Sequence, residues 1–160
     1  MNKAYLLLGG NLGNRLQNLQ AAKQLIERTC GEISRTSSVY ETAAWGRTDQ
    51  TDFYNQAIEL KTELNAKQLM RRVLKIEKQL GRQRKEKFAP RLIDIDILFF
   101  NDEVCDYPFL KLPHPAVHLR RFALIPLAEI TNLTHPVLKK TISELLQACA
   151  DNLQVKEIAE

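Results

Sequence analysis

The chain has 160 residues, of which 44% are hydrophobic and 26% are charged, a composition that indicates one globular domain spanning residues 1–160. No apolar run reaches the roughly 18 residues that a membrane helix needs, and the N-terminus is too brief for a secretory signal, so we expect a cytoplasmic protein with no membrane partner. The net charge of +4 is too small to indicate nucleic-acid binding, and three cysteines fit neither a disulfide framework nor a Cys-x-x-Cys site.

The beginning of the chain predicts a strand, a glycine-rich turn and a helix. Residues 5–8 form a short apolar run closed by Gly9 and Gly10, long enough for a buried strand. Asn14 can cap the next helix, in which apolar residues recur at three- and four-residue steps until Gly31. Because the segment 9–14 has neither the Walker A pattern nor the Gly-x-Gly-x-x-Gly spacing, we favour a structural turn over a nucleotide loop.

Strands and helices continue to alternate beyond residue 31. We expect strands over 33–40 and 53–60, a helix from Asn65 to Gly81, the strongest strand over 92–100, and helices over 122–130 and 142–150. The order is strand, helix, strand, strand, helix, strand, followed by a tail. This order predicts an α+β fold, a ferredoxin-like antiparallel sheet with packed helices in a single domain. Such a fold does not by itself define a function.

Two acidic residues, Asp94 and Asp96, stand on the strongest predicted strand. Side chains at i and i+2 share a face, so both carboxylates project together while Ile93, Ile95 and Ile97 point to the opposite side. Two like charges on an otherwise apolar strand need a compensating cation, and hard oxygen ligands suit Mg²⁺. The pair alone is equally consistent with a solvated or ion-paired face.

The positive charge is concentrated directly before this acidic pair. Residues 71–91 carry 9 basic and 2 acidic side chains. The part that follows Gly81 has no apolar periodicity and is expected to be a mobile loop, in which Arg82, Arg84 and Arg91 could grip phosphate. A solvated charge run is the common alternative. A cationic loop beside paired carboxylates favours phosphoryl transfer.

Other candidate residues indicate a function only weakly when each is taken alone. Two prolines flank His114, which makes it a possible donor to a phosphate, although a surface histidine is the simpler interpretation. The aromatic residues that open the strand over 53–60 would ordinarily belong to the core. Combined with the acidic pair and the basic loop, these segments are more informative than any one of them.

Taken together, the segments resemble the 6-hydroxymethyl-7,8-dihydropterin pyrophosphokinase family. Its members act in the folate pathway, where they move the terminal pyrophosphate of ATP onto a pterin alcohol and release AMP. The resemblance covers nearly the whole chain. Its most specific motifs are Gly81-Arg82-x-Arg84, Pro90-Arg91-x-x-Asp94-x-Asp96, Pro113-His114-Pro115 and Arg120-x-Phe122.

The resemblance implies a site for each substrate. Asp94 and Asp96 would hold two Mg²⁺ ions against the phosphates of ATP, and with them Arg82 and Arg91 would be catalytic. The ATP site would include both arginines together with Glu77, Arg84, Phe88, His114 and Arg120. The pterin would lie between two aromatic rings and be recognised by an amide, in a site made of Thr42, Ala43, Trp45, Phe53, Asn55 and Phe122.

Two other functions compete with this interpretation. A ferredoxin-like RNA-binding module could use sheet aromatics and the basic loop, but the aromatic strand motif of such modules is absent. A two-metal nucleotidyltransferase would use the same acidic pair and release pyrophosphate instead of AMP. Since members of the resembled family act as monomers on small molecules, we expect a monomer without a nucleic-acid partner.

Overall fold

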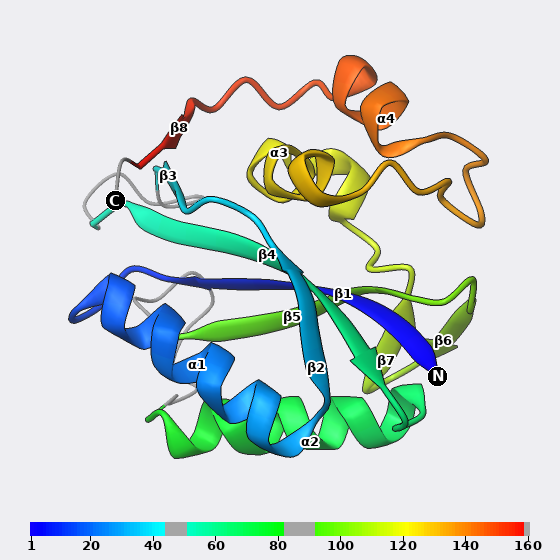
Figure 1. Ribbon diagram of the computed structural model, residues 1–160. Coiled ribbons are helices and arrows are strands. Elements are labelled where there is room, and N and C mark those ends of the chain that lie inside the picture. The colour runs from blue at the N-terminus through cyan, green and yellow to red at the C-terminus, as the bar shows by residue number, and fades with distance from the viewer. Residues whose placement is uncertain (44–50, 82–91, 159–160) are drawn as a thin grey trace.

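The structure is a computed structural model that describes residues 1–43, 51–81 and 92–158 (Figure 1). Three segments, 44–50, 82–91 and 159–160, lie outside the described residues. The described elements are, in chain order, β1 (Asn2–Gly10), α1 (Arg15–Thr29), β2 (Glu32–Thr36), β3 (Tyr40–Thr42), β4 (Phe53–Thr62), α2 (Ala66–Gln79), β5 (Asp94–Phe100), β6 (Cys105–Tyr107), β7 (Leu110–Leu112), a 3₁₀ turn (Val117–Leu119), α3 (Arg121–Ile130), α4 (Ile142–Ala148) and β8 (Val155–Glu157).

The main sheet has six strands in the order β5, β1, β4, β3 and β8, and β2 also pairs with β4. The pairings in this sheet are antiparallel. The strand from the last βαβ unit therefore lies beside β1 at one side, and the two strands that follow α1 lie beyond β4 at the other. This arrangement confirms the predicted α+β fold with a ferredoxin-like antiparallel sheet.

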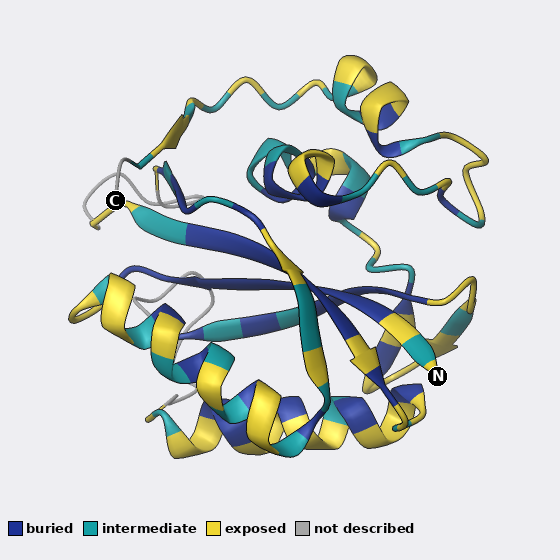
Figure 2. Ribbon diagram, viewed as in Figure 1, coloured by how far each residue is buried: buried dark blue, intermediate teal, exposed yellow. Residues whose placement is uncertain are grey.

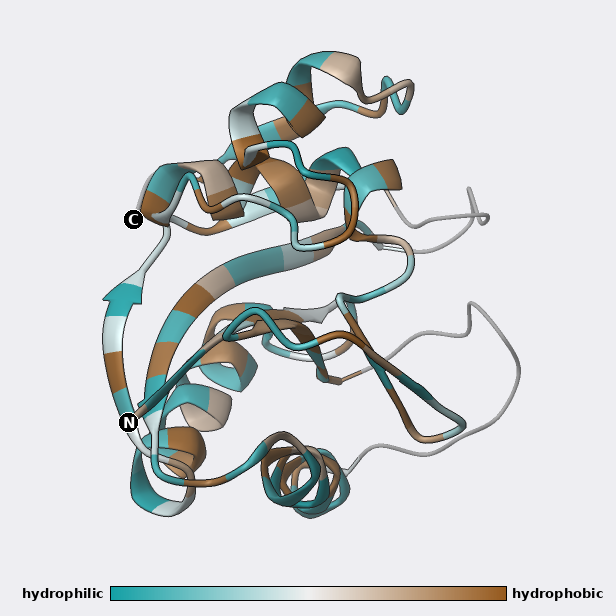
Figure 3. Ribbon diagram, turned by 90° about the vertical axis from the view of Figure 1, so that its right-hand side faces the viewer, coloured by the Kyte–Doolittle hydropathy of each residue, from teal (hydrophilic) through white to brown (hydrophobic). Residues whose placement is uncertain are grey.

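Helices cover both faces of the sheet, with α1 and α2 on one face and α3 and α4 on the other (Figure 1). Alternation along β1 divides the core between these layers. Leu6 and Leu8 pack in the cluster formed with α1 and α2, whereas Tyr5 and Leu7 pack in the cluster formed with α3. Buried residues of the helices face the sheet in Figure 2, and Figure 3 shows the same layers from the side.

Local sequence signals set where the first two helices begin. The side chain of Asn14 accepts a hydrogen bond of 3.1 Å from the backbone N–H of Gln17. At α2, Asn65 and Gln68 form a capping box in which each side chain accepts from the other residue's backbone N–H. Both N-caps are at the predicted positions, because these contacts involve only residues close in sequence.

The predicted strand over 33–40 is wrong in its continuity, since it is divided into β2 and β3. Between them, the hydroxyl of Ser37 accepts from the backbone N–H of Ala57, and the N–H of Ser37 donates to the carbonyl of Ala57. A side chain thus replaces a backbone acceptor and interrupts the ladder. The pairing register with β4 also shifts between Ile33 and Arg35.

Three short strands, β6, β7 and β8, are absent from the sequence-based prediction. Each has three residues, too few for an alternating pattern to be recognised. The glycine-rich segment also differs from its prediction, because β1 continues through Gly9 and Gly10, and the positive φ of 72° occurs later, at Gly13. Within the described ranges, none of the helices combines the length and hydrophobicity needed to cross a bilayer.

Candidate active site

The two aspartates of β5 lie on the sheet face that α3 covers. Asp96 pairs with Leu7, which packs in the α3-side cluster, and Asp94 pairs with Gly9. The neighbouring isoleucines, including Ile95, are buried in the opposite cluster with α1 and α2. Both residues are partly exposed, although Oδ1 of Asp94 is buried. The prediction that these carboxylates share a face is confirmed.

Gly9 stands between the acidic strand and the predicted pterin residues. It pairs with Asp94 of β5 on one side and with Asn55 of β4 on the other. A Cβ atom at this position would lie 2.3 Å from Oδ1 of Asn55, so the amide occupies the space that a side chain would fill. Directly paired residues project to the same face of a sheet. Asn55, Gly9 and Asp94 therefore form one row across three strands on this face of the sheet, and the Asn55 amide fills the space above Gly9.

The predicted pterin residues that the structure describes lie on or next to the strands of this row and on α3. Nδ2 of Asn55 donates a 3.2 Å hydrogen bond to Oγ1 of Thr42, and both residues are buried, at 4% and 3% exposure. Phe53 pairs with Thr42 and is half-buried. Phe122, in the first turn of α3, packs against the core cluster of the same sheet face, and Ala43 is exposed at the end of β3.

Glu77 of α2 joins the helix to the acidic strand. Its side chain is 3% exposed, and Oε2 accepts a 2.7 Å hydrogen bond from the backbone N–H of Ile95, the residue between the two aspartates. A buried carboxylate bound to a backbone N–H is a strong, charge-assisted contact. Glu77 is thus placed to hold β5 in position, and its contact with ATP stays a prediction.

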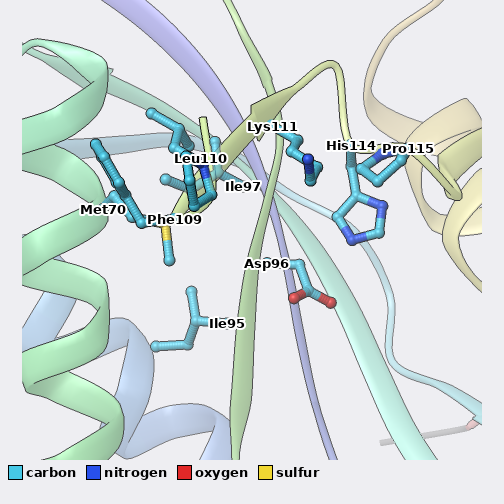
Figure 4. A pocket seen from close by; sticks show the side chains of 10 residues that line it. Met70, Ile95, Asp96, Ile97, Phe109, Leu110, Lys111, His114 and Pro115 are labelled. Atoms are coloured by element: carbon cyan, nitrogen blue, oxygen red, sulfur yellow. The ribbon is translucent and has the colours of Figure 1, made fainter. Parts of the chain in front are cut away.

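A pocket of about 240 Å³ opens beside Asp96 (Figure 4). Its apolar part includes Met70 of α2 and Phe109 from the β6–β7 hairpin, while Asp96 and His114 lie toward the other end. The complete lining is Met70, Ile95, Asp96, Ile97, Pro108, Phe109, Leu110, Lys111, His114 and Pro115. An apolar cavity with a few converging polar groups is the usual form of a small-molecule site.

His114 is held in a defined orientation and protonation state. Its backbone N–H donates to the carbonyl of Leu98 at 2.9 Å, and its Nδ1 accepts from the N–H of Ala116 at 3.1 Å. Burial, with a smaller contribution from the positive charge of Arg120, lowers the pKa of His114 to about 4. The ring is therefore neutral at physiological pH, and because Nδ1 is an acceptor, its proton is on Nε2. Nε2 is then available to donate to a ligand.

Arg120 lies between His114 of the pocket and Phe122, one of the predicted pterin residues. Its guanidinium carbon lies 5.6 Å from the centroid of the Phe122 ring, within the range of a cation–π contact. After burial, its positive charge is the second cause of the lowered pKa of His114. The motif around His114 and the motif around Arg120 are therefore neighbours in space.

The sequence did not reveal the apolar wall of the pocket. Met70 belongs to the regular apolar stripe of α2, and Phe109 lies on a hairpin that was not predicted. The rings of Tyr107 and Phe109 stack with centroids 5.6 Å apart and an interplanar angle of 14°, and Nζ of Lys67 lies 4.4 Å from the Tyr107 centroid. The only hint of this wall in the sequence was the pair of aromatic residues Tyr107 and Phe109, separated by one position.

Five predicted site residues lie outside the described residues: Trp45, Arg82, Arg84, Phe88 and Arg91. Within the described ranges, no three His, Cys, Asp or Glu side chains form a group that could enclose a metal. The donor set at the sheet face is the carboxylate pair of Asp94 and Asp96. It fits Mg²⁺, which usually binds one or two protein carboxylates and completes its coordination with water and substrate phosphates.

The fold and the site define the class as an α+β protein in which two same-face carboxylates, of the kind that bind magnesium, lie beside a small-molecule pocket. The chain belongs to the 7,8-dihydro-6-hydroxymethylpterin-pyrophosphokinase (HPPK) family, whose model matches residues 5–132. This membership favours the pyrophosphokinase interpretation over the RNA-binding module and the nucleotidyltransferase.

Named relatives agree with the family match. The 2-amino-4-hydroxy-6-hydroxymethyldihydropteridine pyrophosphokinase of Aquifex aeolicus is 41% identical over 145 residues, which cover 90% of each chain. The Bacillus subtilis protein of the same name is 42% identical over 130 residues, covering 81% of this chain and 78% of that protein. The Haemophilus influenzae protein of that name is 32% identical over 157 residues, or 98% of each chain.

Solved structures agree on the fold. A crystal structure of Plasmodium falciparum HPPK-DHPS matches 92% of this chain with a TM-score of 0.75 and 20% sequence identity. The present chain spans 43% of the length of that protein. At this level of identity the likeness supports the α+β architecture.

Proposed function

We propose that this chain transfers the terminal pyrophosphate of ATP to 6-hydroxymethyl-7,8-dihydropterin, forming the pterin diphosphate and AMP for folate biosynthesis. The reaction class follows from family membership. The observation that carries the proposal is the row formed by Asn55, Gly9 and Asp94 on adjacent strands. In this row an amide suited to a pterin edge and a carboxylate suited to magnesium project from the same face of the sheet.

The nucleotide is proposed to occupy the pocket between α2 and the β6–β7 hairpin. Its base would lie against the apolar lining that includes Met70 and Phe109, and its phosphates would extend toward Lys111, His114 and Asp96. The amine of Lys111 and the Nε2–H of His114 can each donate to phosphate oxygens. The family resemblance adds proposed contacts from Glu77, Arg82, Arg84, Phe88, Arg91 and Arg120.

The pterin is proposed to bind between the rings of Phe53 and Phe122, because aromatic faces stack favourably on a flat bicyclic ring. The amide of Asn55 offers both a donor and an acceptor to its polar edge. The hydrogen bond from Asn55 to Thr42 holds this amide in one orientation. Ala43 and Trp45 complete the site by resemblance.

The proposed metal ligands are Asp94 and Asp96, and we propose two Mg²⁺ ions. When bound, magnesium neutralises negative charge on the phosphates and polarises them toward attack. The carboxylates would supply the hard oxygen ligands. Glu77, by accepting from the N–H of Ile95 between the two aspartates, would hold this part of β5 in position.

The proposed chemistry is an in-line displacement at the β-phosphorus of ATP. The hydroxymethyl oxygen of the pterin forms a new bond to that phosphorus, and the bond from the β-phosphorus to the oxygen joining it to the α-phosphorus breaks. AMP leaves with the electron pair, and the hydroxyl proton passes to solvent or to an aspartate. Arg82, Arg91 and the Nε2–H of His114 would offset negative charge as it moves.

One assay separates this reaction from the alternatives. The chain is incubated with Mg·ATP and the hydroxymethyl dihydropterin, and the nucleotide product is identified by chromatography. AMP together with a pterin diphosphate is the expected result. Release of pyrophosphate would indicate nucleotidyl transfer and overturn the proposal, as would the absence of reaction combined with tight RNA binding.

We also propose that residues 1–160 act as one domain and as a monomer. The expected result of light scattering after size exclusion is a mass of about 18.4 kDa, that of one chain. A mass of twice this value that persists on dilution would contradict the monomer.

A further inference from the structure

Arg15, the first residue of α1, makes three contacts that the proposed reaction does not use. Its Nη1 lies 3.2 Å from Oε2 of Glu41 on β3 and donates to the carbonyl of Asp52 at 2.7 Å. Its guanidinium carbon lies 3.8 Å from the centroid of the Tyr54 ring on β4. One side chain thus joins the start of a helix to two neighbouring strands.

These contacts are on the reverse side of the strands that carry the proposed pterin residues. Glu41 pairs with Tyr54, and the next pair along the ladder is Thr42 with Phe53. Successive residues of a strand point to opposite faces. Tyr54 accordingly packs toward the cluster of α1 and α2, whereas Phe53 projects to the face of α3. Arg15 therefore contacts β3 and β4 on the sheet face opposite to the one that carries the proposed pterin residues.

Neighbouring strands also hold this pair, because β3 forms three pairs with β8 and β4 pairs with β1 as far as Tyr54, but these contacts are made along the strand edges and not on the face that Arg15 covers. β3 has three residues, and its register with β4 comprises three pairs. Short strand pairs are marginal without packing against other elements. Asn11, in the turn between β1 and α1, holds the backbone just before Phe53, because its Nδ2 donates to the carbonyl of Thr51 at 3.0 Å. Both Arg15 and this turn thus position the first residues of β4.

We infer that Arg15 is a positioning residue for the pterin subsite, acting through Glu41 and Tyr54 on Thr42, Phe53 and Asn55. The inference rests on the proposed function, since it assigns the pterin to those three residues. Arg15 is suited to this task because its planar guanidinium can bond to a carboxylate in its plane and stack on an aromatic ring through its face. Lysine offers no such combination.

A purely stabilising role makes a different prediction. If Arg15 acts mainly by positioning, its loss should change the free energy of unfolding little, because partly exposed ion pairs contribute on the order of 0–1 kcal/mol to folding. Misplacement of binding groups by about 1 Å can cost up to about 100-fold in rate. A positioning role therefore appears in pterin kinetics, whereas a purely stabilising role lowers the unfolding transition without separating the two substrates.

The test compares Arg15→Ala and Arg15→Lys with Arg28→Ala, a matched control at an exposed position in the last turn of the same helix. We expect Arg15→Ala to raise the KM for the pterin by about tenfold and to leave the KM for ATP unchanged. Arg15→Lys should restore part of the loss, because it keeps the charge near Glu41 but lacks the stacking surface. The control should behave as wild type.

The contact with Glu41 is tested by a double-mutant cycle. Glu41→Gln combined with Arg15→Ala should raise the pterin KM by much less than the product of the two single effects, because both changes remove one contact. A wild-type pterin KM in Arg15→Ala overturns the inference alone. Equal rises for both substrates with a lowered unfolding transition also overturn it. If the wild-type chain neither binds nor converts the pterin, the proposed function fails and this inference falls with it.

Discussion

The substitution Gly9→Ala tests the row that joins the two halves of the site. The new Cβ would lie 2.3 Å from Oδ1 of Asn55 and 3.4 Å from the carbonyl oxygen of Tyr54, so it has no room unless the amide moves. By intrinsic preference, replacing glycine in a strand with alanine stabilises a protein by about 0.5–1 kcal/mol. The structure predicts the opposite sign.

The magnitude follows from what Asn55 loses when its amide moves away. The hydrogen bond to Thr42 breaks at a site where both residues are buried, which costs about 1–3 kcal/mol when a polar group is left unsatisfied. Strain from overpacking adds on the order of 1 kcal/mol. We expect the free energy of unfolding to fall by about 2–4 kcal/mol. If the displaced amide forfeits 1–3 kcal/mol of pterin binding, the pterin KM rises roughly 5- to 150-fold.

The assay pairs steady-state kinetics for each substrate with urea unfolding. The KM for ATP should remain unchanged, because the proposed nucleotide pocket lies on the other side of β5. As an internal control, Gly9→Ala is repeated in an Asn55→Ala background, where the colliding atom is absent and most of the cost in stability should disappear. Wild-type pterin kinetics with unchanged or increased stability in Gly9→Ala would refute the reasoning.

Four further outcomes are expected. Asp96→Asn should reduce turnover by at least about 100-fold while stability is kept or increased, because repulsion from the neighbouring carboxylate is relieved; near-normal turnover would remove Asp96 from the metal site. Phe109→Ala should raise the KM for ATP several-fold and leave the pterin KM unchanged, and equal effects on both would argue against a base-binding wall. Glu77→Leu should lower the free energy of unfolding by about 1–3 kcal/mol because the buried N–H of Ile95 loses its acceptor, whereas Glu77→Gln should retain most of it, as urea unfolding can show. The ring resonance of His114 should stay constant in NMR titrations from pH 8 to about 5.5, since the pKa of its side chain is about 4. This folded-state pKa lies below the ordinary value of 6.5. The contribution of His114 to stability is therefore fully present above pH 6.5 and is lost as the pH falls toward 4.

Features that depend on neighbouring residues could be predicted from the sequence. Asp94 and Asp96 share a face because alternation is a property of any strand, and Asn14 and Asn65 cap their helices through contacts within one turn. The alternation of elements was also sufficient to indicate the α+β class. In each case the determining contacts lie within a few residues of one another.

Other features depended on contacts between distant segments and could not be predicted in this way. The division of the strand over 33–40 results from the Ser37 hydroxyl bonding to Ala57 on β4. The pocket wall combines Met70 of α2 with Phe109 of a hairpin whose strands have three residues each. Neither set of contacts leaves a periodic signal in the chain.

Gly9 shows most clearly where the two kinds of information meet. From the chain alone we could predict that a glycine follows the first apolar run, that two carboxylates share a face, and that an aromatic residue and an amide open another strand. The position of β1 between β4 and β5, in the register that pairs Gly9 with both Asn55 and Asp94, emerges only when the chain is folded. Side-chain direction follows from local backbone geometry, whereas strand order and register follow from burying the two faces of the sheet against helices distant in sequence.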